Sequence, residues 1–365
     1  MKVILVLPSQ ESVYSNLYEV FADLTAGLSL LSIESKIVEV TFGDSAAYPF
    51  GNVDHITKSQ LSQFFDSVAG SNKVLVTVDD HKMVKWLYKN KKVENMVIWA
   101  HYFYGSRYIF QLYRNSNEVF PIKYTSRLRS LFAAMVPNTI AIRASSFYWK
   151  TLHRYPVFSQ SLWTGLLLER VFSISVSGKV LIPVDQRLYN FPEPEKREGV
   201  LVFLGSAGET DLASLNYALN TLDSSLLARL DYFGNEEAER IFENIYGIKM
   251  NFIGKVTRKD LLRSYSEHMI TISPIFNGNF EMVPIQSLLC GTPVISFSQP
   301  FLEVIGENNM TANIRNLGEI KYKVKQWMDL DQQARISMKH TIFEKMESRK
   351  VAKDLLQYLQ TLGFS

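Results

Sequence analysis

The chain has 365 residues, of which 47% are hydrophobic and 21% are charged, and its formal net charge is +3. This composition excludes a disordered or collagen-like chain, and the length corresponds to about two domains that each bury a core. No apolar stretch approaches the ~18 uninterrupted residues of a membrane span, so no transmembrane segment is expected. The single cysteine, Cys290, excludes an intramolecular disulfide framework, and no Cys/His cluster has zinc-site spacing. The opening MKVILVLPSQE is expected to be a β-strand rather than a signal peptide, which predicts a cytoplasmic location.

The positive charge is concentrated in one segment. Between His101 and Arg170 there are nine basic and two acidic residues, a local net charge of +7, whereas the rest of the chain carries −4. The segment is also rich in Tyr, Phe and Trp. A basic, aromatic stretch in an otherwise acidic chain favours a polyanionic partner, although a solvated basic face would give the same pattern.

The N-terminal half alternates apolar strands with helical patterns. Helical apolar spacing covers residues 13–32, and an amphipathic helix is predicted over 81–88, directly after Asp79 and Asp80. Strands alternating with helices predict a parallel, doubly wound sheet. The predicted strands are Val3–Leu7, Lys36–Thr41, Lys73–Val78, Met96–Ala100 and Thr139–Arg143.

A second alternation follows a connecting segment, residues 180–198, that carries prolines and the mixed charge run PEPEKRE. A helix is predicted over 211–222, and the tail from 321 to 362 is mostly helical. The sequence therefore predicts an N-terminal domain (1–178), a C-terminal domain (179–345), and a C-terminal helix (346–365) that packs back on the first domain. The predicted strands here are Gly199–Leu204, Leu230–Phe233 and Met250–Ile253.

The stretch from Met269 to Gly306 completes this second half as a βαβ unit. An apolar strand (269–273) leads through a polar loop into a short helix that starts near Pro284 and stops at Gly291, before a second strand (294–297). Such a helix directs unpaired N–H groups and its positive dipole end at the loop, which suits a diphosphate. Two Rossmann-like domains facing a central cleft form the GT-B arrangement of glycosyltransferases, and this is the predicted fold.

Short motifs along the chain resemble the DNA β-glucosyltransferase family of T-even bacteriophages. They are PSQESVY (8–14), YFGN (232–235), FIGK (252–255) and FNGNF (276–280), in the family's order. The resemblance implies a phage-encoded monomer in the host cytoplasm that transfers glucose, arabinose or a similar sugar from a UDP-sugar. The implied acceptor is 5-hydroxymethylcytosine in duplex DNA, or a sugar already attached to it. It implies no covalently bound cofactor. The fold does not require a metal ion, but participation of Mg²⁺ or Mn²⁺ is an alternative.

The βαβ stretch also resembles the large retaining GT-B family that builds polysaccharides and glycolipids. Gly291-Thr292-Pro293-Val294 and Glu303 fit its pattern, whereas Gly278 and Gln286 stand at its two glutamate positions. A retaining enzyme that acts on a lipid-linked or polysaccharide acceptor is therefore an alternative interpretation of the function. An inactive GT-B protein that only binds DNA is another alternative, because Gly208 and Leu212 replace two arginines of the phage family.

The acceptor-side candidates are His101 and Glu11. The resemblance places His101 where the phage family has its aspartate base, and an imidazole with a pKa near ~6.5 is a competent base. Retaining enzymes instead use a histidine at a similar strand end to contact the donor sugar. Glu11 falls on the family's cleft glutamate, where it would bond acceptor or sugar hydroxyls, or complement a helix dipole. Asp79 and Asp80 are alternative bases, or caps of the following helix.

The resemblance also implies residues that bind the donor and the DNA. Backbone groups at 255–256 are expected to read the uracil edge, and an amide at Gln286 or a hydroxyl at Ser287 to hold the ribose. Aromatic and arginine side chains after His101 would stack an extruded base and hold its phosphates, or else meet a membrane surface. The donor candidates are Gly205, Ser206, Lys255, Val256, Arg258, Phe276, Asn279, Gln286 and Ser287, and the DNA candidates are Tyr102, Arg107, Arg114, Lys123, Arg127 and Arg129.

Overall fold

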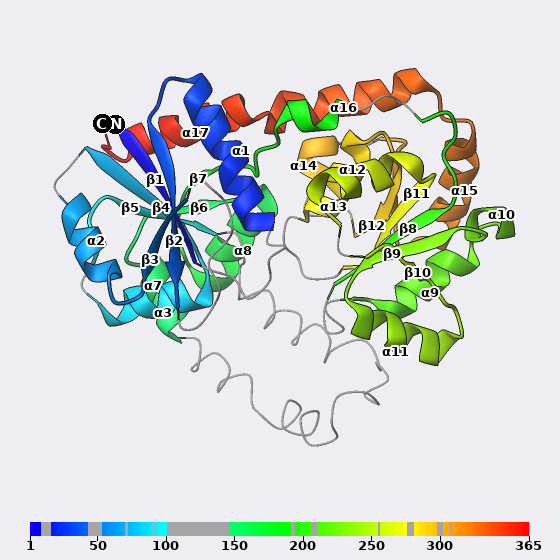
Figure 1. The fold of residues 1–365 in the computed structure, drawn as a ribbon, viewed down its shortest axis with the longest axis horizontal. Helices are drawn as coiled ribbons and strands as arrows, with labels where there is room; N and C mark the ends of the chain where they lie inside the picture. Colours follow the sequence, from blue (N-terminus) through cyan, green and yellow to red (C-terminus); the bar gives the residue numbers. More distant parts are fainter. Residues whose placement is uncertain are drawn as a thin grey trace. The chain divides into compact units, whose positions relative to one another are not determined.

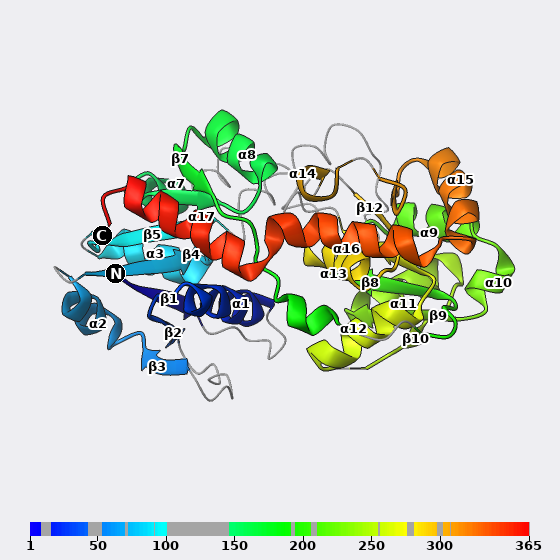
Figure 2. The same cartoon turned by 90° about the horizontal axis from the view of Figure 1, so that it is seen from above.

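The computed structural model of the chain describes residues 1–8, 16–42, 53–69, 72–90, 92–100, 146–190, 194–205, 210–254, 256–275, 281–297, 302–306 and 308–364. The chain forms two compact units, Met1–Asp185 with Met346–Ser365, and Gln186–Lys345. In each unit the described strands make one parallel sheet with helices against it (Figures 1 and 2). The predicted α/β class with two Rossmann-like units is therefore confirmed.

The sheet of the first unit has β1 near its centre. Neighbouring strands are parallel throughout the described sheet. β1 is buried from Val3 to Pro8, as expected for a strand covered by helices on both faces. In their order across the sheet, the strands are β3 (Val53–Thr57), β2 (Ser35–Thr41), β1 (Lys2–Pro8), β4 (Lys73–Val78), β5 (Met96–Ala100), β6 (Val157–Ser159) and β7 (Val176–Lys179).

Two groups of helices cover this sheet. α2, α3 and α7 bury their apolar faces against one face of the sheet, where Ile4 and Val6 of β1 contribute to the core. α1 and α17 lie side by side on the other face, where Phe21 of α1 stacks on Trp99 of β5 (Figures 1 and 2). The helices are α1 (Asn16–Leu30), α2 (Leu61–Val68), α3 (His81–Lys89), α7 (Ser146–Leu152), α8 (Leu162–Phe172) and α17 (Ser348–Thr361).

Helix α17 reaches this unit from the far end of the chain. It approaches α1 so closely that a Cβ at Gly27 would lie 2.0 Å from the carbonyl oxygen of Ser348. Further along α17, the ring of Tyr358 lies against Gly178 and 5.8 Å from the ring of Phe158. The last residues of the chain are therefore part of the core of the first unit.

The second unit repeats the plan with a six-stranded parallel sheet among the described residues. α9, α11 and α15 pack on one face and α12 and α13 on the other (Figure 1). The strands, in sheet order, are β10 (Asn251–Phe252), β9 (Leu230–Gly234), β8 (Val200–Leu204), β11 (Ile270–Ser273), β12 (Val294–Ser296) and β13 (Thr311–Asn313). The helices are a 3₁₀ turn (Gln186–Tyr189), α9 (Leu212–Asn220), α10 (Ser224–Leu227), α11 (Glu236–Tyr246), α12 (Arg258–Glu267), α13 (Met282–Leu289), α14 (Leu302–Ile305), α15 (Leu317–Met328) and α16 (Gln332–Met346).

The predicted elements are confirmed to within a few residues wherever the structure describes them, and Thr139–Arg143 lies outside the described residues. α13 begins at Met282, two residues before the predicted start, so Pro284 is its third residue. This position is still in the first turn, where a missing N–H costs nothing. The sequence analysis missed β3, β6, β7 and β13, because each is short and β3 alternates buried and exposed residues only weakly.

We expect Gly27→Ala to destabilise the first unit by at least ~1–3 kcal/mol, because the new methyl group meets backbone atoms of Ser348 that cannot rotate away. Thermal denaturation measures the effect. Ser29→Ala is the matched control, since Ser29 is exposed on the same helix and should leave the melting temperature unchanged. Equal melting temperatures for the two variants would contradict the close packing of α1 on α17.

Candidate functional site

The carboxyl ends of β8 and β11 are tied together in the second unit. Thr210 forms an antiparallel bridge with Ile275, and the N–H of Asp211 donates to the carbonyl of Pro274 at 2.8 Å. Gly205 lies so close that a Cβ there would stand 2.6 Å from Cδ1 of Ile275. Ligands of open α/β sheets bind outside the carboxyl ends of the strands, so this edge is the candidate site.

Helix α13 starts at this edge and is buried along its whole length. It connects the parallel strands β11 and β12, which confirms the predicted βαβ unit. Glu281 stands at the N-cap without a side-chain cap hydrogen bond. The N–H groups of Met282 and Val283 have no acceptor within the helix, because they belong to its first turn. They lie at the positive end of the helix dipole, an arrangement that suits a phosphate.

Two buried arginines hold the opposite end of α13. Arg197 donates to the hydroxyl of Thr292 at 2.6 Å and to the carbonyl of Cys290 at 3.0 Å. Arg335 donates to the carbonyl of Gly291. Cations at a helix C-terminus are stabilised by the dipole, and these two also bond the carbonyl groups of the C-cap residue Cys290 and of Gly291 after it. The sequence analysis missed both arginines, because only the fold brings them to this helix.

The two proposed ribose-binding residues on α13 differ in their surroundings. The hydroxyl oxygen of Ser287 lies 2.8 Å from the hydroxyl of Thr271 and 2.9 Å from the carbonyl oxygen of Thr292. Ser287 is fully buried, so this hydroxyl fastens α13 to β11 and to the turn that follows the helix. Gln286 is 5% exposed. Of the pair, we therefore keep Gln286 as the candidate for donor contact.

The loop after β10 ends at the start of α12. Gly254 has a φ of +86°, which favours glycine in this turn. Thr257 caps α12 by accepting a hydrogen bond from the N–H of Asp260 at 3.2 Å. The candidates Val256 and Arg258 flank this cap and are half-buried. They lie at the carboxyl ends of the parallel strands, as a donor-binding role requires.

In the first unit, two aspartates follow β4 at its carboxyl end. Asp80 caps α3 by accepting hydrogen bonds from the N–H groups of Lys82 and Met83 at 2.8 and 3.1 Å, which confirms the capping interpretation. Asp79 is fully buried, and its carboxylate accepts a hydrogen bond from the hydroxyl of Tyr148 at 2.5 Å. The neighbouring strand β5 ends at the buried residue Ala100.

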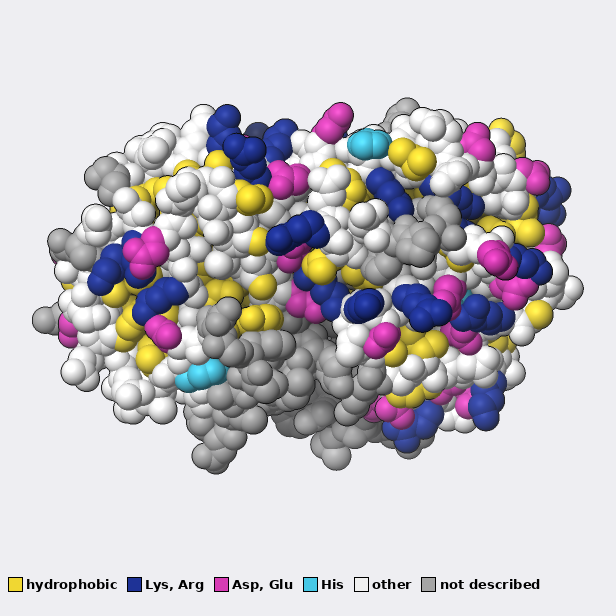
Figure 3. Space-filling model, turned by 45° about the horizontal axis from the view of Figure 1, so that its top comes forward, with side chains coloured by type: hydrophobic (Ala, Val, Ile, Leu, Met, Phe, Trp, Pro, Cys, Tyr) yellow, Lys and Arg dark blue, Asp and Glu magenta, His cyan; other side chains and the backbone are white. Residues whose placement is uncertain are grey.

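The remaining candidates lie outside the described residues. On the face drawn in Figure 3, the described Lys and Arg side chains are interspersed with Asp and Glu. The proposed contacts with DNA and with the acceptor therefore rest on the sequence. The candidates outside the described residues are Glu11, His101, Ser206, Lys255, Phe276 and Asn279, and, for DNA, Tyr102, Arg107, Arg114, Lys123, Arg127 and Arg129.

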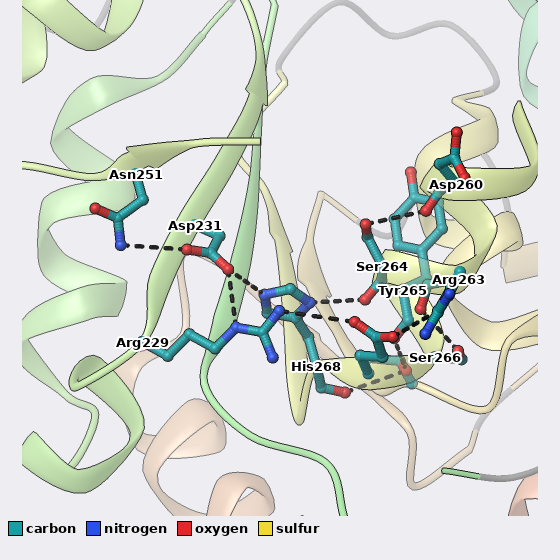
Figure 4. A network of polar contacts seen from close by, with 11 residues as sticks. Arg229, Asp231, Asn251, Asp260, Arg263, Ser264, Tyr265, Ser266 and His268 are labelled. Atoms are coloured by element: carbon teal, nitrogen blue, oxygen red, sulfur yellow. Dashed lines mark hydrogen bonds and ion pairs between the residues drawn. The ribbon is translucent and has the colours of Figure 1, made fainter. Parts of the chain in front are cut away.

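A polar network occupies the opposite edge of the second sheet, at the amino ends of β9 and β11 (Figure 4). The buried His268 contacts the carboxylate of Asp231 at 3.0 Å and the carbonyl of Ser264 at 2.7 Å. Burial lowers the pKa of His268. Burial would raise the pKa of Asp231, but hydrogen bonds from Arg229, His268 and Asn251 hold it below its ordinary value. The network lies at the opposite ends of the strands from the N-terminus of α13. We therefore interpret it as stabilising the fold and not as part of the candidate site.

Within the described residues, no three or more His, Cys, Asp or Glu side chains are grouped as a metal site would require. The helices of the described ranges are also too short or too polar to cross a membrane.

Comparison with known proteins agrees with this geometry. Residues 198–329 match a family model described as "Glycosyl transferases group 1". Sucrose-phosphate synthase from Thermosynechococcus elongatus superposes with a TM-score of 0.66 at 14% identity, covering 100% of both chains. An α-glucosyltransferase in complex with UDP and a 13-mer DNA containing an HMU base gives 0.64 at 10% identity, covering 99% of both. The lipopolysaccharide outer core galactosyltransferase WaaB gives 0.64 at 12%, covering 99% of this chain and 100% of that one. No curated protein matches the sequence significantly.

The predicted GT-B fold is confirmed by these similarities, which extend over the whole chain. At identities of 10–14% the solved structures establish the fold alone. The residues that match the glycosyltransferase family model, 198–329, fall within the second unit, which contains α13 and the candidate site.

Glu281, at the start of α13, was not singled out from the sequence. Its carboxyl group accepts a hydrogen bond from the hydroxyl of Ser273 at the end of β11. Burial raises the pKa of Glu281 to about 8, against a smaller opposing effect of that hydrogen bond. At neutral pH the group therefore holds its proton, and the first turn of α13 carries no carboxylate charge that would repel a phosphate.

We expect Glu281→Gln to change how stability depends on pH. The folded-state pKa of about 8 exceeds the ordinary value near ~4.3, so the wild type loses stability as pH rises from about 4 to 8. Glutamine cannot ionise, so the variant should exceed the wild type in melting temperature by a few degrees more at pH 8.5 than at pH 5. Glu237→Gln, an exposed change on α11, is the control. A difference independent of pH would contradict the raised pKa.

Proposed function

We propose that this chain, a GT-B glycosyltransferase of the group 1 type, moves a sugar from a UDP-sugar to 5-hydroxymethylcytosine in duplex DNA. A sugar already attached to that base is an equivalent acceptor. Residues 1–178 would bind the DNA, residues 179–345 the UDP-sugar, and the reaction would take place in the cytoplasm of a phage-infected cell. The enzyme would act as a monomer.

The observation that carries the donor half of this proposal is the start of α13. The N–H groups of Met282 and Val283 lie at its positive end, and burial raises the pKa of the neighbouring Glu281 to about 8, which favours its uncharged form. A diphosphate carries negative charge that such a helix end stabilises. Backbone groups at 255–256 would read the uracil edge, and the amide of Gln286 would bond the ribose hydroxyls.

The remaining donor contacts belong to the loops at the same edge. Gly205 and Ser206 would let the backbone approach the phosphates, and Arg258 would add a charge at the start of α12. Phe276 and Asn279 would contact the sugar from the loop between β11 and α13. No metal is required in this arrangement, because the helix end and cationic side chains neutralise the phosphates.

The acceptor half rests on the motifs of the first unit. His101 would take the proton of the acceptor hydroxyl or contact the donor sugar, and Glu11 would bond the acceptor. The aromatic and basic residues between Tyr102 and Arg129 would stack the extruded base and hold its flanking phosphates. The similarity to an enzyme solved with UDP and DNA supports this acceptor class.

A second candidate function is transfer to a lipid-linked or polysaccharide acceptor. It is favoured by the sequence Gly291-Thr292-Pro293-Val294 and by the structural similarity to a lipopolysaccharide galactosyltransferase. DNA affinity separates the two, because each phosphate neutralised by the protein steepens the dependence of affinity on salt. An inactive DNA-binding protein, the third alternative, would show that salt dependence without turnover.

The experiment that tests the proposal is nucleoside mass spectrometry after incubation with a panel of UDP-sugars and duplex DNA that carries 5-hydroxymethylcytosine. We expect a pentose or hexose mass increment on the modified base and none on unmodified DNA. His101→Ala should abolish transfer, and Glu11→Gln should reduce it about tenfold or more. UDP release on lipid or glycan acceptors, with no increment on DNA, would establish the second candidate instead.

Variants of Gln286 and Ser287 should distinguish a residue that contacts the donor from one that stabilises the position of α13. We expect Gln286→Ala to raise the KM for the UDP-sugar several-fold with little change in stability. Ser287→Ala should leave that KM unchanged and lower the free energy of unfolding by about 1–3 kcal/mol, because Thr271 loses its buried partner. Steady-state kinetics and denaturant unfolding measure both effects. The reverse pattern would assign the donor contact to Ser287.

A further inference from the structure

The turn between β6 and α8 lies at the carboxyl edge of the first sheet, the edge at which open α/β sheets bind their ligands. Ser159, the last residue of β6, pairs in register with Ala100, the last residue of β5. His101, the candidate base, follows Ala100 in the chain. Only two residues separate β6 from α8. The first turn of α8 therefore belongs to the same edge as the strand end that leads to His101.

Several contacts hold the first turn of α8 in place. Ser161 caps the helix by accepting a hydrogen bond from the N–H of Thr164 at 3.0 Å, and the hydroxyl oxygens of these two residues lie 2.9 Å apart. The carbonyl of Ser159 accepts a hydrogen bond from the N–H of Val180 at 2.8 Å. A Cβ at Gly165 would lie 3.1 Å from the hydroxyl oxygen of Ser159, so the helix packs closely on the end of β6. The backbone of this turn therefore has a fixed position at the sheet edge.

Helix α8 carries apolar side chains on two sides. Leu168 is buried in the core of the first unit. Leu162, Trp163 and Leu166 are instead 57%, 38% and 41% exposed, and their spacing places them together on what we call the exposed side of α8. Within the described part of the chain, the Trp163 indole stacks on no other ring and its N–H donates no hydrogen bond. A helix that is apolar all round is normally buried, so the exposed side is expected to be covered by a ligand or partner.

The charges beside this exposed side limit what covers it. Arg170 is exposed one turn after Leu166 and two turns after Trp163, on the same side of the helix, and Glu169 is exposed next to it. Membrane binding scales with the apolar area buried, and three side chains supply little of it. An anionic membrane surface would also repel Glu169. A small flat ring that carries a phosphate fits better, because the ring can stack on the indole and the guanidinium can bond the phosphate.

We propose that Trp163 is the platform on which the cytosine extruded from the DNA acceptor stacks, and that Arg170 bonds a phosphate of the same strand. Leu162 and Leu166 border the stacked base and exclude water from it. The assignment rests on the acceptor half of the proposed function and deepens it. It places the base at the β6–α8 turn, beside the strand end that leads to His101.

Binding of fluorescently labelled duplexes to the full-length protein, measured by anisotropy, tests the assignment. One duplex carries 5-hydroxymethylcytosine, and the other has an abasic site at the same position, where no base can stack. We expect Trp163→Ala to weaken binding of the first duplex about ten- to a hundredfold, and of the second less than about threefold. Trp163→Phe, which keeps an aromatic face, should retain most of the affinity. Arg170→Gln should weaken both duplexes and lower the slope of log affinity against log salt by about 0.9.

Tyr322→Ala is the matched control, because Tyr322 is an aromatic residue 65% exposed on α15, in the second unit. It should leave the affinity for both duplexes and the salt slope unchanged. Melting temperatures of all the variants should lie within a few degrees of the wild type, because each altered side chain is exposed. The affinity for UDP should not change in any of them, since the assignment concerns the acceptor alone.

Trp163→Ala that weakens both duplexes equally, or neither, would overturn the assignment, while sugar transfer to DNA by the wild type would leave the proposed function standing. Failure of the wild type to bind and to glycosylate the modified duplex would reject the DNA acceptor and the assignment with it. Loss of binding to phosphatidylcholine–phosphatidylserine vesicles in Trp163→Ala, with unchanged DNA affinity, would assign the exposed side of α8 to a membrane surface. A wild-type dimer that Trp163→Ala converts to a monomer, with unchanged DNA affinity, would assign it to a second copy of the chain.

Discussion

Two guanidinium groups that bond the turn directly after α13 hold the helix on which the candidate donor site depends. Arg197 and Arg335 reach it from the segment before β8 and from α16, and Ser287 fastens its middle to β11. Every residue of the helix is buried, and a shift of the helix would break hydrogen bonds of two buried arginines, which is costly. At the N-terminal end of the helix, an anion would be stabilised by the dipole.

Much of this fold follows from patterns that the sequence displays openly. Apolar runs such as Val3–Leu7 and Met96–Ala100 are buried on both faces and so read as strands of a parallel sheet. Proline and glycine marked the ends of α13 to within two residues. Strands at the margins of the sheets were missed, because β3 is largely exposed and β6 has three residues, too few for a periodic signal.

The site was less readable than the fold for a physical reason. Motifs report residues that are close in sequence, so they found Gln286 and Ser287 but could not tell the buried tether from the candidate contact. Arg315 and Asp211 are about a hundred residues apart and meet only because β8, β11, β12 and β13 lie in that order. Burial also raises the pKa of Glu281, and the sequence around this residue does not reveal how buried it is.

The first unit is assembled from two separated pieces of chain, residues 1–185 and 346–365, whereas the second is one continuous piece. During synthesis the strands of the first unit emerge early, but α17, which covers part of their sheet beside Gly27, emerges only after residues 186–345. Its core therefore stays open to solvent while residues 186–345 are made, and the second unit is the first that can finish folding. The order in which the two units can complete folding during synthesis is thus the reverse of the order in which they begin along the chain.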